Sequence, residues 1–341
     1  MENKKNRKYN ILILGMGSNV SQGIFKALHS ITGVSLHIVG ACISKSSVGL
    51  FMCDESVIMP LAGEDGFVTW YINICNDKNI DMVFTGVEEN IDALVRNREF
   101  IEKSCNAKFV YPEEEIWNIG FDKYDTCQWL KKNGIPYPDF ALASDDKGLS
   151  ELIMRVGFPL IAKPRRGKSS AGIITAHSLK DLMAVIGNDE YVVQECVGDE
   201  DSEYTIGCYF TMDGALKSKI TLHRYLKNGT TSIAEIVQDK DIDKVIDMVA
   251  DNIKTRGPLN IQMRKRFDGT PVCFEWNVRY SGATAIRNHF GFRDVEAALR
   301  EDVLSENIDD CFEMQKSGFA IRYDAEMYFP DRNLKEVQGE W

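Results

Sequence analysis

The sequence predicts an α/β protein that begins with a parallel, doubly wound domain and continues into antiparallel hairpins. Over roughly the first 110 residues, strand patterns alternate with helical patterns, which is typical of a parallel sheet. Beyond residue 200, two Asp-Gly pairs each separate alternating apolar runs, which is a strong hairpin signal. A chain of 341 residues is too long for one ordinary core, so we expect two or three structural units.

Composition and charge limit the classes of protein that fit. With 44% hydrophobic and 27% charged residues, the chain is typical of a soluble globular protein. A net charge of −11 argues against nucleic acid as a partner, since phosphate backbones need a basic surface. No apolar run is long enough to span a membrane, and no secretory signal follows the basic N-terminus. The nine scattered cysteines include no CxxC pair, so we expect reduced thiols and a cytoplasmic location.

The first domain is predicted from periodicity and from the turns between its elements. The expected strands cover residues 9–15, 35–43, 81–86 and 107–112, and the expected helices cover 20–28 and 87–103. Strands and helices in alternation indicate βαβ units with a parallel sheet.

The Gly15–Gly17 pair after the first strand invites a dinucleotide-binding interpretation, but the signal is weak. Val20 stands where the fingerprint has its third glycine. The second strand ends at residues 44–46, Ser-Lys-Ser, where a carboxylate for the ribose is expected. A tight βα turn is favoured, and a dinucleotide-dependent oxidoreductase remains an alternative.

From residue 122 onward, the sequence predicts a second group of helices and strands. Asp122 is predicted to cap a helix that Gly134 ends. The elements expected after it are a helix at 148–157, a strand at 158–164, a strand at 173–176, a helix at 179–187 and a strand at 191–197.

The Gly-Lys-Ser tripeptide at 167–169 resembles the end of a P-loop, but the pattern fails twice. Ala162 stands where the first glycine belongs, and a β-branched run rather than a helix follows. The small-residue loop at 167–172 therefore joins two strands. Such a loop can cradle phosphate beneath a fixed charge from Lys163, or it can be an ordinary flexible hairpin.

The second Asp-Gly turn, at 268–269, predicts which side chains face each other. In a two-residue turn Phe267 faces Thr270, and counting back places Gln262 opposite Glu275. A helix at about 240–255 precedes this hairpin.

Because side chains alternate along a strand, Asn277 and Arg279 share the face of Glu275. One carboxylate with two amide oxygens suits Mg²⁺, and Arg279 stands where phosphate charge would develop. A solvated polar face of an exposed hairpin is the alternative.

These motifs together resemble the ATP-grasp superfamily. The resemblance rests on Lys163 before the small-residue loop, then VVQECV…EYT, then NIQ…FEWNVR, in this order. Its most specific part combines GFPLIAKPRRGKSSAG with GPLNIQ and FEWNVRYSG, and it covers about residues 9–300. Within the superfamily, the carbamoyl-phosphate-synthase large-chain branch is the most similar.

The resemblance implies a domain plan. It predicts an ATP-grasp fold with a Rossmann-like pre-ATP-grasp domain at 1–115, and a linker helix with a small lid domain at 116–195. A larger antiparallel catalytic domain at 196–310 and a C-terminal tail at 311–341 follow. ATP would lie between the lid and the catalytic domain.

The resemblance also implies roles for individual residues. Lys123 and Lys163 would contact ATP phosphates, and the lid loop would contribute Gly167, Ser169, Ser170 and Gly172. Glu195 and the backbone near Val197 would hold adenine. Glu203 would hold the ribose, unless Glu200 or Asp201 takes its place. Gln262, Glu275 and Asn277 would bind Mg²⁺, for which Mn²⁺ can substitute, and Arg279 and Arg224 would steady the transferred phosphoryl group. Apart from the resemblance, Arg287 and Ser281 are candidates for the substrate side, where Arg287 either pairs with a substrate carboxylate or has a structural role.

The chain departs from the family pattern in three respects. The stretch at 198–202, Gly-Asp-Glu-Asp-Ser, is longer than usual between the adenine and ribose residues. Asn-Val-Arg at 277–279 replaces Asn-Pro-Arg but keeps the functional side chains, and there is one ATP-grasp unit rather than two. The implied activity is that of an ADP-forming ligase that joins a small carboxylate to an amine, such as an amino acid or amino sugar, through an acyl phosphate. A homodimer is expected by analogy. A non-catalytic nucleotide-binding regulatory protein of the same fold is the other alternative.

Overall fold

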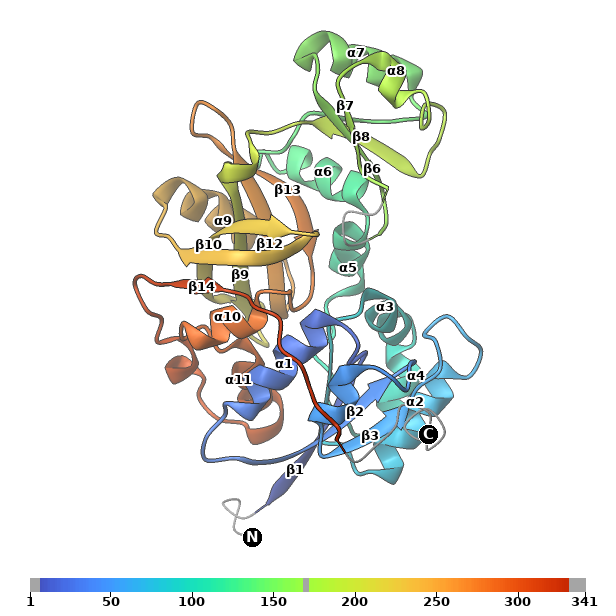
Figure 1. Ribbon diagram of the computed structural model, residues 1–341, viewed down its shortest axis with the longest axis vertical. Coiled ribbons are helices and arrows are strands. Elements are labelled where there is room, and N and C mark those ends of the chain that lie inside the picture. Colours follow the sequence, from blue (N-terminus) through green and yellow to red (C-terminus); the bar gives the residue numbers. More distant parts are fainter. Residues whose placement is uncertain (1–6, 168–171, 331–341) are drawn as a thin grey trace.

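The computed structural model describes residues 7–167 and 172–330, and within them it shows three sheets (Figure 1). The first has four strands in the order β3-β2-β1-β4. The second is a six-stranded sheet in the order β13-β12-β9-β10-β11-β14. The third, smaller sheet has the order β5-β8-β6-β7. The prediction of a parallel sheet followed by antiparallel hairpins is confirmed.

All strands of the N-terminal sheet are parallel, and helices accompany them along the chain. Its elements are β1 (Lys8–Leu14), α1 (Asn19–His29), β2 (Ser35–Cys42), β3 (Glu55–Ile58), α2 (Phe67–Asp77), β4 (Met82–Thr85), α3 (Glu88–Arg96) and α4 (Arg98–Ser104). The helix predicted over 87–103 is two helices that meet at Asn97. The strand predicted at 107–112 is wrong, since Lys108 makes only an isolated bridge to Met82.

Two helices connect this unit to the small sheet, and Asp122 separates them. The elements are α5 (Glu114–Phe121), α6 (Lys123–Lys132), β5 (Phe140–Leu142), α7 (Asp146–Val156), β6 (Leu160–Pro164), β7 (Ile174–Ala176), α8 (Leu179–Leu182) and β8 (Tyr191–Glu195). As predicted, Asp122 caps α6, because its carboxylate accepts the Tyr124 N–H at 2.9 Å. The helix expected over 179–187 is only the short α8.

The C-terminal part is built on the long hairpins. Its elements are β9 (Glu203–Phe210), β10 (Leu216–Lys227), β11 (Thr230–Ile236), α9 (Lys240–Asn252), β12 (Gly257–Lys265), β13 (Pro271–Asn277), α10 (Thr284–His289), α11 (Asp294–Leu299) and β14 (Phe319–Ile321). In Figure 1 the chain after β14 runs past α1 to the N-terminal unit.

The β12–β13 hairpin reaches its predicted register by an unexpected route. Gln262 does pair with Glu275. The prediction that Phe267 faces Thr270 is wrong, because the Arg266 N–H bonds the Thr270 carbonyl at 2.9 Å and the turn is one residue longer. A register shift between Gln262 and Met263 adds one residue back on β13. The two offsets cancel.

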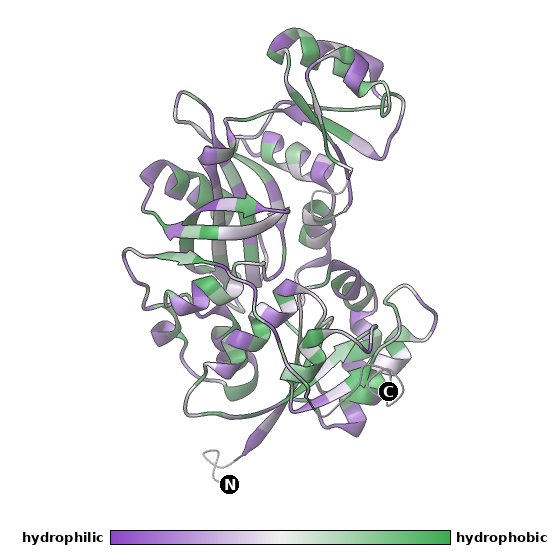
Figure 2. Ribbon diagram, viewed as in Figure 1, coloured by the Kyte–Doolittle hydropathy of each residue, from purple (hydrophilic) through white to green (hydrophobic). Residues whose placement is uncertain are grey.

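The buried side chains form separate cores. Apolar residues of β1, such as Ile11 and Ile13, share a core with Leu222 and Phe292 of the C-terminal part. The small sheet has its own core, which includes Leu152. Figure 2 shows apolar residues concentrated on the N-terminal sheet. Across the described residues, no helix is long and apolar enough to cross a membrane.

The turn between β4 and α3 offers a test of this packing. A Cβ on Gly86 would lie 2.3 Å from Val20 Cγ1 and 3.1 Å from the Ser21 nitrogen, so Gly86→Ala must displace α1. We expect it to lower the free energy of unfolding by about 1–3 kcal/mol in urea titrations. Gly63→Ala meets no atom within 4 Å, and this control should stay within about 0.5 kcal/mol of the parent. Equal effects of both substitutions would contradict this packing.

Candidate active site

A polar cleft of about 540 Å³ lies between the N-terminal unit and the C-terminal sheet. From the N-terminal unit it is lined by Ser18, Asn19, Val20, Gly86, Val87 and Glu88. From the C-terminal part it is lined by Arg224, Gly229, Thr230, Thr231, Asn260, Gln262, Glu275, Asn277, Arg279, Ser281 and Gly282.

The topology of the parallel sheet explains why the cleft lies here. Strand order reverses between β1 and β4, and the two strands end at Leu14 and Thr85. The chain leaves them in opposite directions, so the turns at residues 15–18 and 86–87 open a crevice at the carboxyl edge of the sheet. Such crevices are the usual ligand sites of open α/β sheets.

The C-terminal wall is built by neighbouring strands. Gln262 on β12 pairs with Glu275 on β13, and Asn260 pairs with Asn277 one step further along the same face. The predicted metal-binding set Gln262, Glu275 and Asn277 is therefore brought together. The Asn277 side-chain N–H donates to Glu275 Oε1 at 3.4 Å.

The electrostatics of the cleft are dominated by cations around one carboxylate. Burial opposes ionisation of Glu275, but four nearby positive charges outweigh it and hold the pKa of Glu275 below its usual value. The four cations are Lys123, Lys163, Arg224 and Arg279. Arg224 and Arg279 are paired with Glu203 and Glu88, so the two lysines, with Glu275 as their counter-charge, supply the surplus of positive charge that suits a polyphosphate.

Lys163 enters from the small sheet and bridges to the C-terminal sheet. It is 5% exposed, and its Nζ donates to the Phe274 carbonyl at 3.3 Å. Burial lowers the pKa of Lys163, and the charge of Glu275 partly opposes that shift. A desolvated ammonium in this position interacts strongly with an incoming anion.

The oxygen donors of the wall fit a magnesium ion bound together with phosphate. Gln262, Glu275 and Asn277 offer one carboxylate and two amide oxygens. Mg²⁺ takes one or two protein carboxylates and completes its shell with water and substrate phosphates. The described residues contain no group of three or more His, Cys, Asp or Glu that could hold a metal. A cation here would therefore depend on ligand oxygens.

Arg279 is held by contacts from two sides of the cleft. Its Nε and Nη2 donate to Glu88 Oε1 at 3.0 and 2.6 Å, and Nη2 also donates to Asn277 Oδ1 at 2.8 Å. The predicted phosphoryl-binding arginine is thus fixed between the C-terminal wall and the start of α3.

The carboxylate predicted to hold the ribose, Glu203, is paired with two arginines. It is 4% exposed, Arg224 donates to its Oε1 at 2.6 Å, and Arg264 donates to its Oε2 at 2.7 Å. Both oxygens are committed to guanidinium groups, so we assign Glu203 to a clamp that positions Arg224. Asp201, the other described candidate, is exposed, and its carbonyl contacts the His223 ring. The side chain of Glu200 lies outside the described residues.

The predicted adenine residues lie where the small sheet joins the C-terminal part. The carboxylate of Glu195 accepts from Arg266 Nε and Nη2 at 2.8 and 2.6 Å. It also accepts the Asp139 N–H at 3.2 Å. Val197 is buried. The side chain of Glu195 therefore ties β8 to the β12–β13 turn, and its contact with adenine stays a prediction.

The start of the predicted lid loop is tied to α6. Lys123 Nζ donates to the Gly167 carbonyl at 2.9 Å, and the Lys123 N–H donates to the Arg165 carbonyl at 2.9 Å. Arg165 in turn donates to Asp122 at 3.0 Å. Of the predicted loop residues, Gly167 and Gly172 are described, whereas Ser169 and Ser170 lie outside the described residues.

The two predicted substrate residues are placed differently. Ser281 lines the cleft, and its Oγ accepts the Ala283 N–H at 3.2 Å. Arg287 is 1% exposed and donates to Thr205 Oγ1 at 2.8 Å and Asn260 Oδ1 at 2.5 Å. These contacts favour the structural alternative for Arg287, since the buried guanidinium supports Asn260 of the cleft wall, and the contact with a substrate carboxylate stays a prediction.

Sequence reasoning missed several cleft residues. Asn260 precedes Gln262 by two positions on one strand, so the alternation that found Gln262 also indicates Asn260. Glu88, Ser18 and Asn19 follow parallel strands, and only knowledge of the strand order brings them together.

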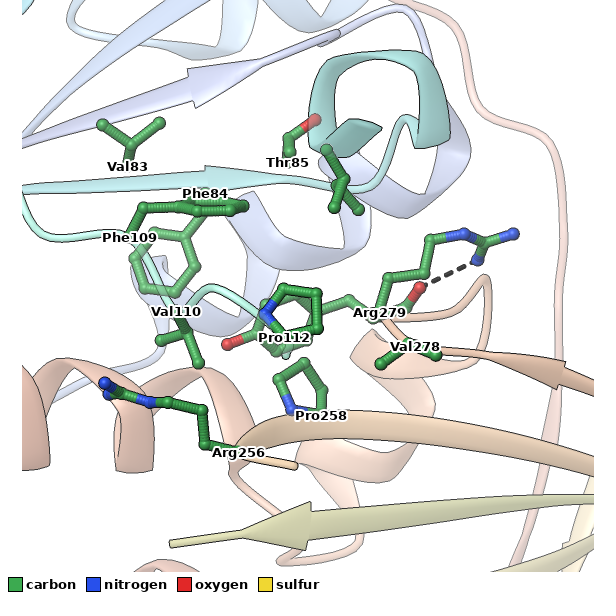
Figure 3. A pocket seen from close by; sticks show the side chains of 12 residues that line it. Val83, Phe84, Thr85, Phe109, Val110, Pro112, Arg256, Pro258, Val278 and Arg279 are labelled. Carbon is green, nitrogen blue, oxygen red and sulfur yellow. Dashed lines mark hydrogen bonds between the residues drawn. The ribbon is translucent and has the colours of Figure 1, made fainter. Parts of the chain in front are cut away.

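A much smaller void of about 20 Å³ lies behind Arg279 (Figure 3). Apolar side chains including Val110, Pro258 and Val278 line it. It has room for about one water molecule, so we interpret it as a packing gap between the units. The Nη1 of Arg279 donates to the Tyr280 carbonyl at 2.9 Å.

Comparisons with known proteins agree with this architecture. Residues 120–230 match the RimK-like ATP-grasp domain. An L-amino acid ligase from Bacillus licheniformis is 16% identical, with a TM-score of 0.66 over 92% of this chain and 78% of that one. N5-carboxyaminoimidazole synthetase from Staphylococcus aureus, complexed with ADP, is 14% identical with a TM-score of 0.68, covering 92% and 82%.

A third similar structure is the biotin carboxylase domain dimer of the Hydrogenobacter thermophilus 2-oxoglutarate carboxylase, in complex with MgADP, ADP and bicarbonate. It is 12% identical with a TM-score of 0.68, and the match covers 92% of this chain and 74% of that one. The chain therefore has the ATP-grasp fold, as predicted. The likeness to the carbamoyl-phosphate-synthase branch stays a prediction.

The clamp around Glu203 gives a stability test. Glu203→Gln leaves Arg224 and Arg264 beside each other without their shared counter-charge. We expect the free energy of unfolding to fall by about 3–5 kcal/mol in urea titrations. Glu235→Gln, on the exposed face of β11, should change it by less than about 0.5 kcal/mol. An unchanged stability with lost ATP affinity would instead restore the ribose assignment.

Proposed function

We propose that this protein is an ATP- and Mg²⁺-dependent ligase that joins a small carboxylic acid to an amine and releases ADP and phosphate. The observation that carries the proposal is the arrangement of four cations around Glu275. Arg224, Arg279 and Glu275 line the oxygen-rich cleft at the switch point of the parallel sheet, and the charges of Lys123 and Lys163 act on Glu275 from outside the cleft lining. The RimK-like match and the ligase among the similar structures support the same class of reaction.

The proposed chemistry is phosphoryl transfer followed by acyl transfer. A carboxylate oxygen of the acid takes the γ-phosphoryl group of ATP, and ADP leaves. The amine nitrogen then bonds to the acyl carbon, the C–O bond to phosphate breaks, and the proton from nitrogen leaves with phosphate or water. ATP supplies the phosphoryl group, and Mg²⁺ bound with it spreads the negative charge over its oxygens.

Residues of this chain would act mainly by positioning and charge stabilisation. Lys163 and Lys123 would bind phosphate oxygens from the small-sheet side, and Arg279 and Arg224 would neutralise the charge that develops on transfer. Glu275 would hold the cation with amide oxygens beside it. By analogy with the biotin carboxylase dimer, we extend the proposal to a homodimer.

The two alternatives are less well supported. A dinucleotide-dependent oxidoreductase would need a carboxylate for the ribose after β2, and residues 44–46 are Ser-Lys-Ser there. A regulatory protein that only binds a nucleotide needs fewer of the charged groups that converge on the cleft.

Product analysis with paired substrates tests the proposal. We expect ADP and phosphate from ATP with Mg²⁺ only when a particular acid and amine, drawn from amino acids and amino sugars, are both present. Glu275→Ala should lower this rate roughly 100-fold, since a group that stabilises the transferring phosphoryl is lost. Asp268→Asn, at the exposed turn of the same hairpin, should leave it unchanged. Formation of AMP and pyrophosphate would contradict phosphoryl transfer to the acid.

A further inference from the structure

The N-terminal end of the cleft carries one carboxylate whose role is not yet assigned. Glu88 is the first residue of α3 and lines the cleft beside Ser18 and Asn19. The β4–α3 turn projects it toward Arg279 of the opposite wall. Its place in the first turn of α3 favours a negative charge there.

Only part of this carboxylate is used within the described structure. Arg279 Nε and Nη2 both donate to the single oxygen Oε1 of Glu88. No hydrogen bond from any described residue reaches Oε2. A carboxylate offers about four lone-pair sites over its two oxygens, so Glu88 keeps acceptor capacity at the cleft. The side chain is 15% exposed, which leaves it accessible to a ligand.

The other carboxylates near the cleft are committed elsewhere. Both oxygens of Glu203 are bonded by Arg224 and Arg264. Glu275 lies among the cations and amide oxygens that suit Mg²⁺ and phosphate. Within the described lining of the cleft, Glu88 is therefore the acid left for a cationic part of a substrate.

We propose that Glu88 binds the ammonium group of the amine substrate and so selects a substrate that arrives as a protonated amine. One proton of the ammonium then passes to water, and the free amine nitrogen attacks the acyl carbon. This inference rests on the proposed ligase function and adds a substrate class and a residue to it. The ammonium would donate to Oε2, while Oε1 keeps Arg279 in place. A charge-assisted bond of this kind both holds the amine and rejects uncharged nucleophiles of similar size.

The position of Glu88 matches the geometry that the reaction needs. Lys163 reaches the cleft region from the small sheet, whereas Glu88 enters from the N-terminal unit. Arg279 contacts Glu88 directly and lies near Glu275. An amine held at Glu88 would approach the acyl carbon from the end of the cleft opposite the small sheet, with Arg279 between the two groups.

Hydroxylamine provides a test, because at mildly alkaline pH it is an uncharged nucleophile that traps an acyl phosphate as a hydroxamate. We compare the parent chain with Glu88→Gln for turnover with the productive amine and for hydroxamate formation from the same acid. We expect Glu88→Gln to raise KM for the amine. The fold-loss in kcat/KM for the amine should be about ten times the fold-loss in the rate of hydroxamate formation. KM for ATP should change less than KM for the amine.

Glu89→Gln is the matched control, since Glu89 is the next residue of α3 and lines a different pocket. It should leave both reactions and the ratio between them unchanged.

Equal losses of both reactions in Glu88→Gln would overturn the inference and make Glu88 a positioning residue for Arg279. An unchanged KM for the amine would also overturn it. Absence of hydroxamate and of ADP from the parent chain would instead overturn the proposed ligase function. Thermal unfolding of both variants shows whether either result reflects misfolding.

Discussion

The concentration of positive charge around Glu275 is the constraint on which the cleft depends. Lys163 reaches it from the small sheet, and Arg224 and Arg279 reach it from the C-terminal part. Bringing several cations into a partly buried site is unfavourable unless anions compensate them. The protein compensates them incompletely, and a polyphosphate would supply the missing charge.

Two carboxylates from different parts of the chain form ion pairs with the arginines of this cluster. Glu203 holds Arg224 together with Arg264, and Glu88 holds Arg279 across the boundary between the N-terminal unit and the C-terminal sheet. These ion pairs fix guanidinium groups that would otherwise repel each other. The N-terminal unit and the C-terminal sheet also share a core, whereas the small sheet has its own. Both walls of the cleft therefore belong to units that share one core, whereas Lys163 comes from the separately packed small sheet.

Part of this arrangement could be predicted from the sequence because it depends on local rules. Strand alternation placed Gln262 opposite Glu275, although the turn was one residue longer than assumed and a bulge restored the register. The cap at Asp122 followed from residue type. Residues whose roles depend on burial or strand order could not be found in this way. Arg287 follows the motif FEWNVRYSG in the sequence, but its side chain is buried behind the cleft wall.

The same limit explains Glu88 and Glu203. Nothing near Glu88 in the sequence indicates Arg279, which lies 191 positions away and meets it only after the two sheets pack. Glu203 stands where the family pattern has a ribose contact, yet its neighbours across the sheet, Arg224 and Arg264, occupy both its oxygens. Arg224 and Arg264 come from the strands on either side of β9, so only the six-stranded sheet order reveals the clamp.

The central claim is that the cation cluster is a nucleotide phosphate site. A crystal structure with Mg²⁺ and a non-hydrolysable ATP analogue tests it most directly. The account predicts the terminal phosphate between Lys163 and Arg279, with the metal ion on Glu275. A nucleotide bound at the Gly15–Gly17 turn, with these side chains unchanged, would contradict it.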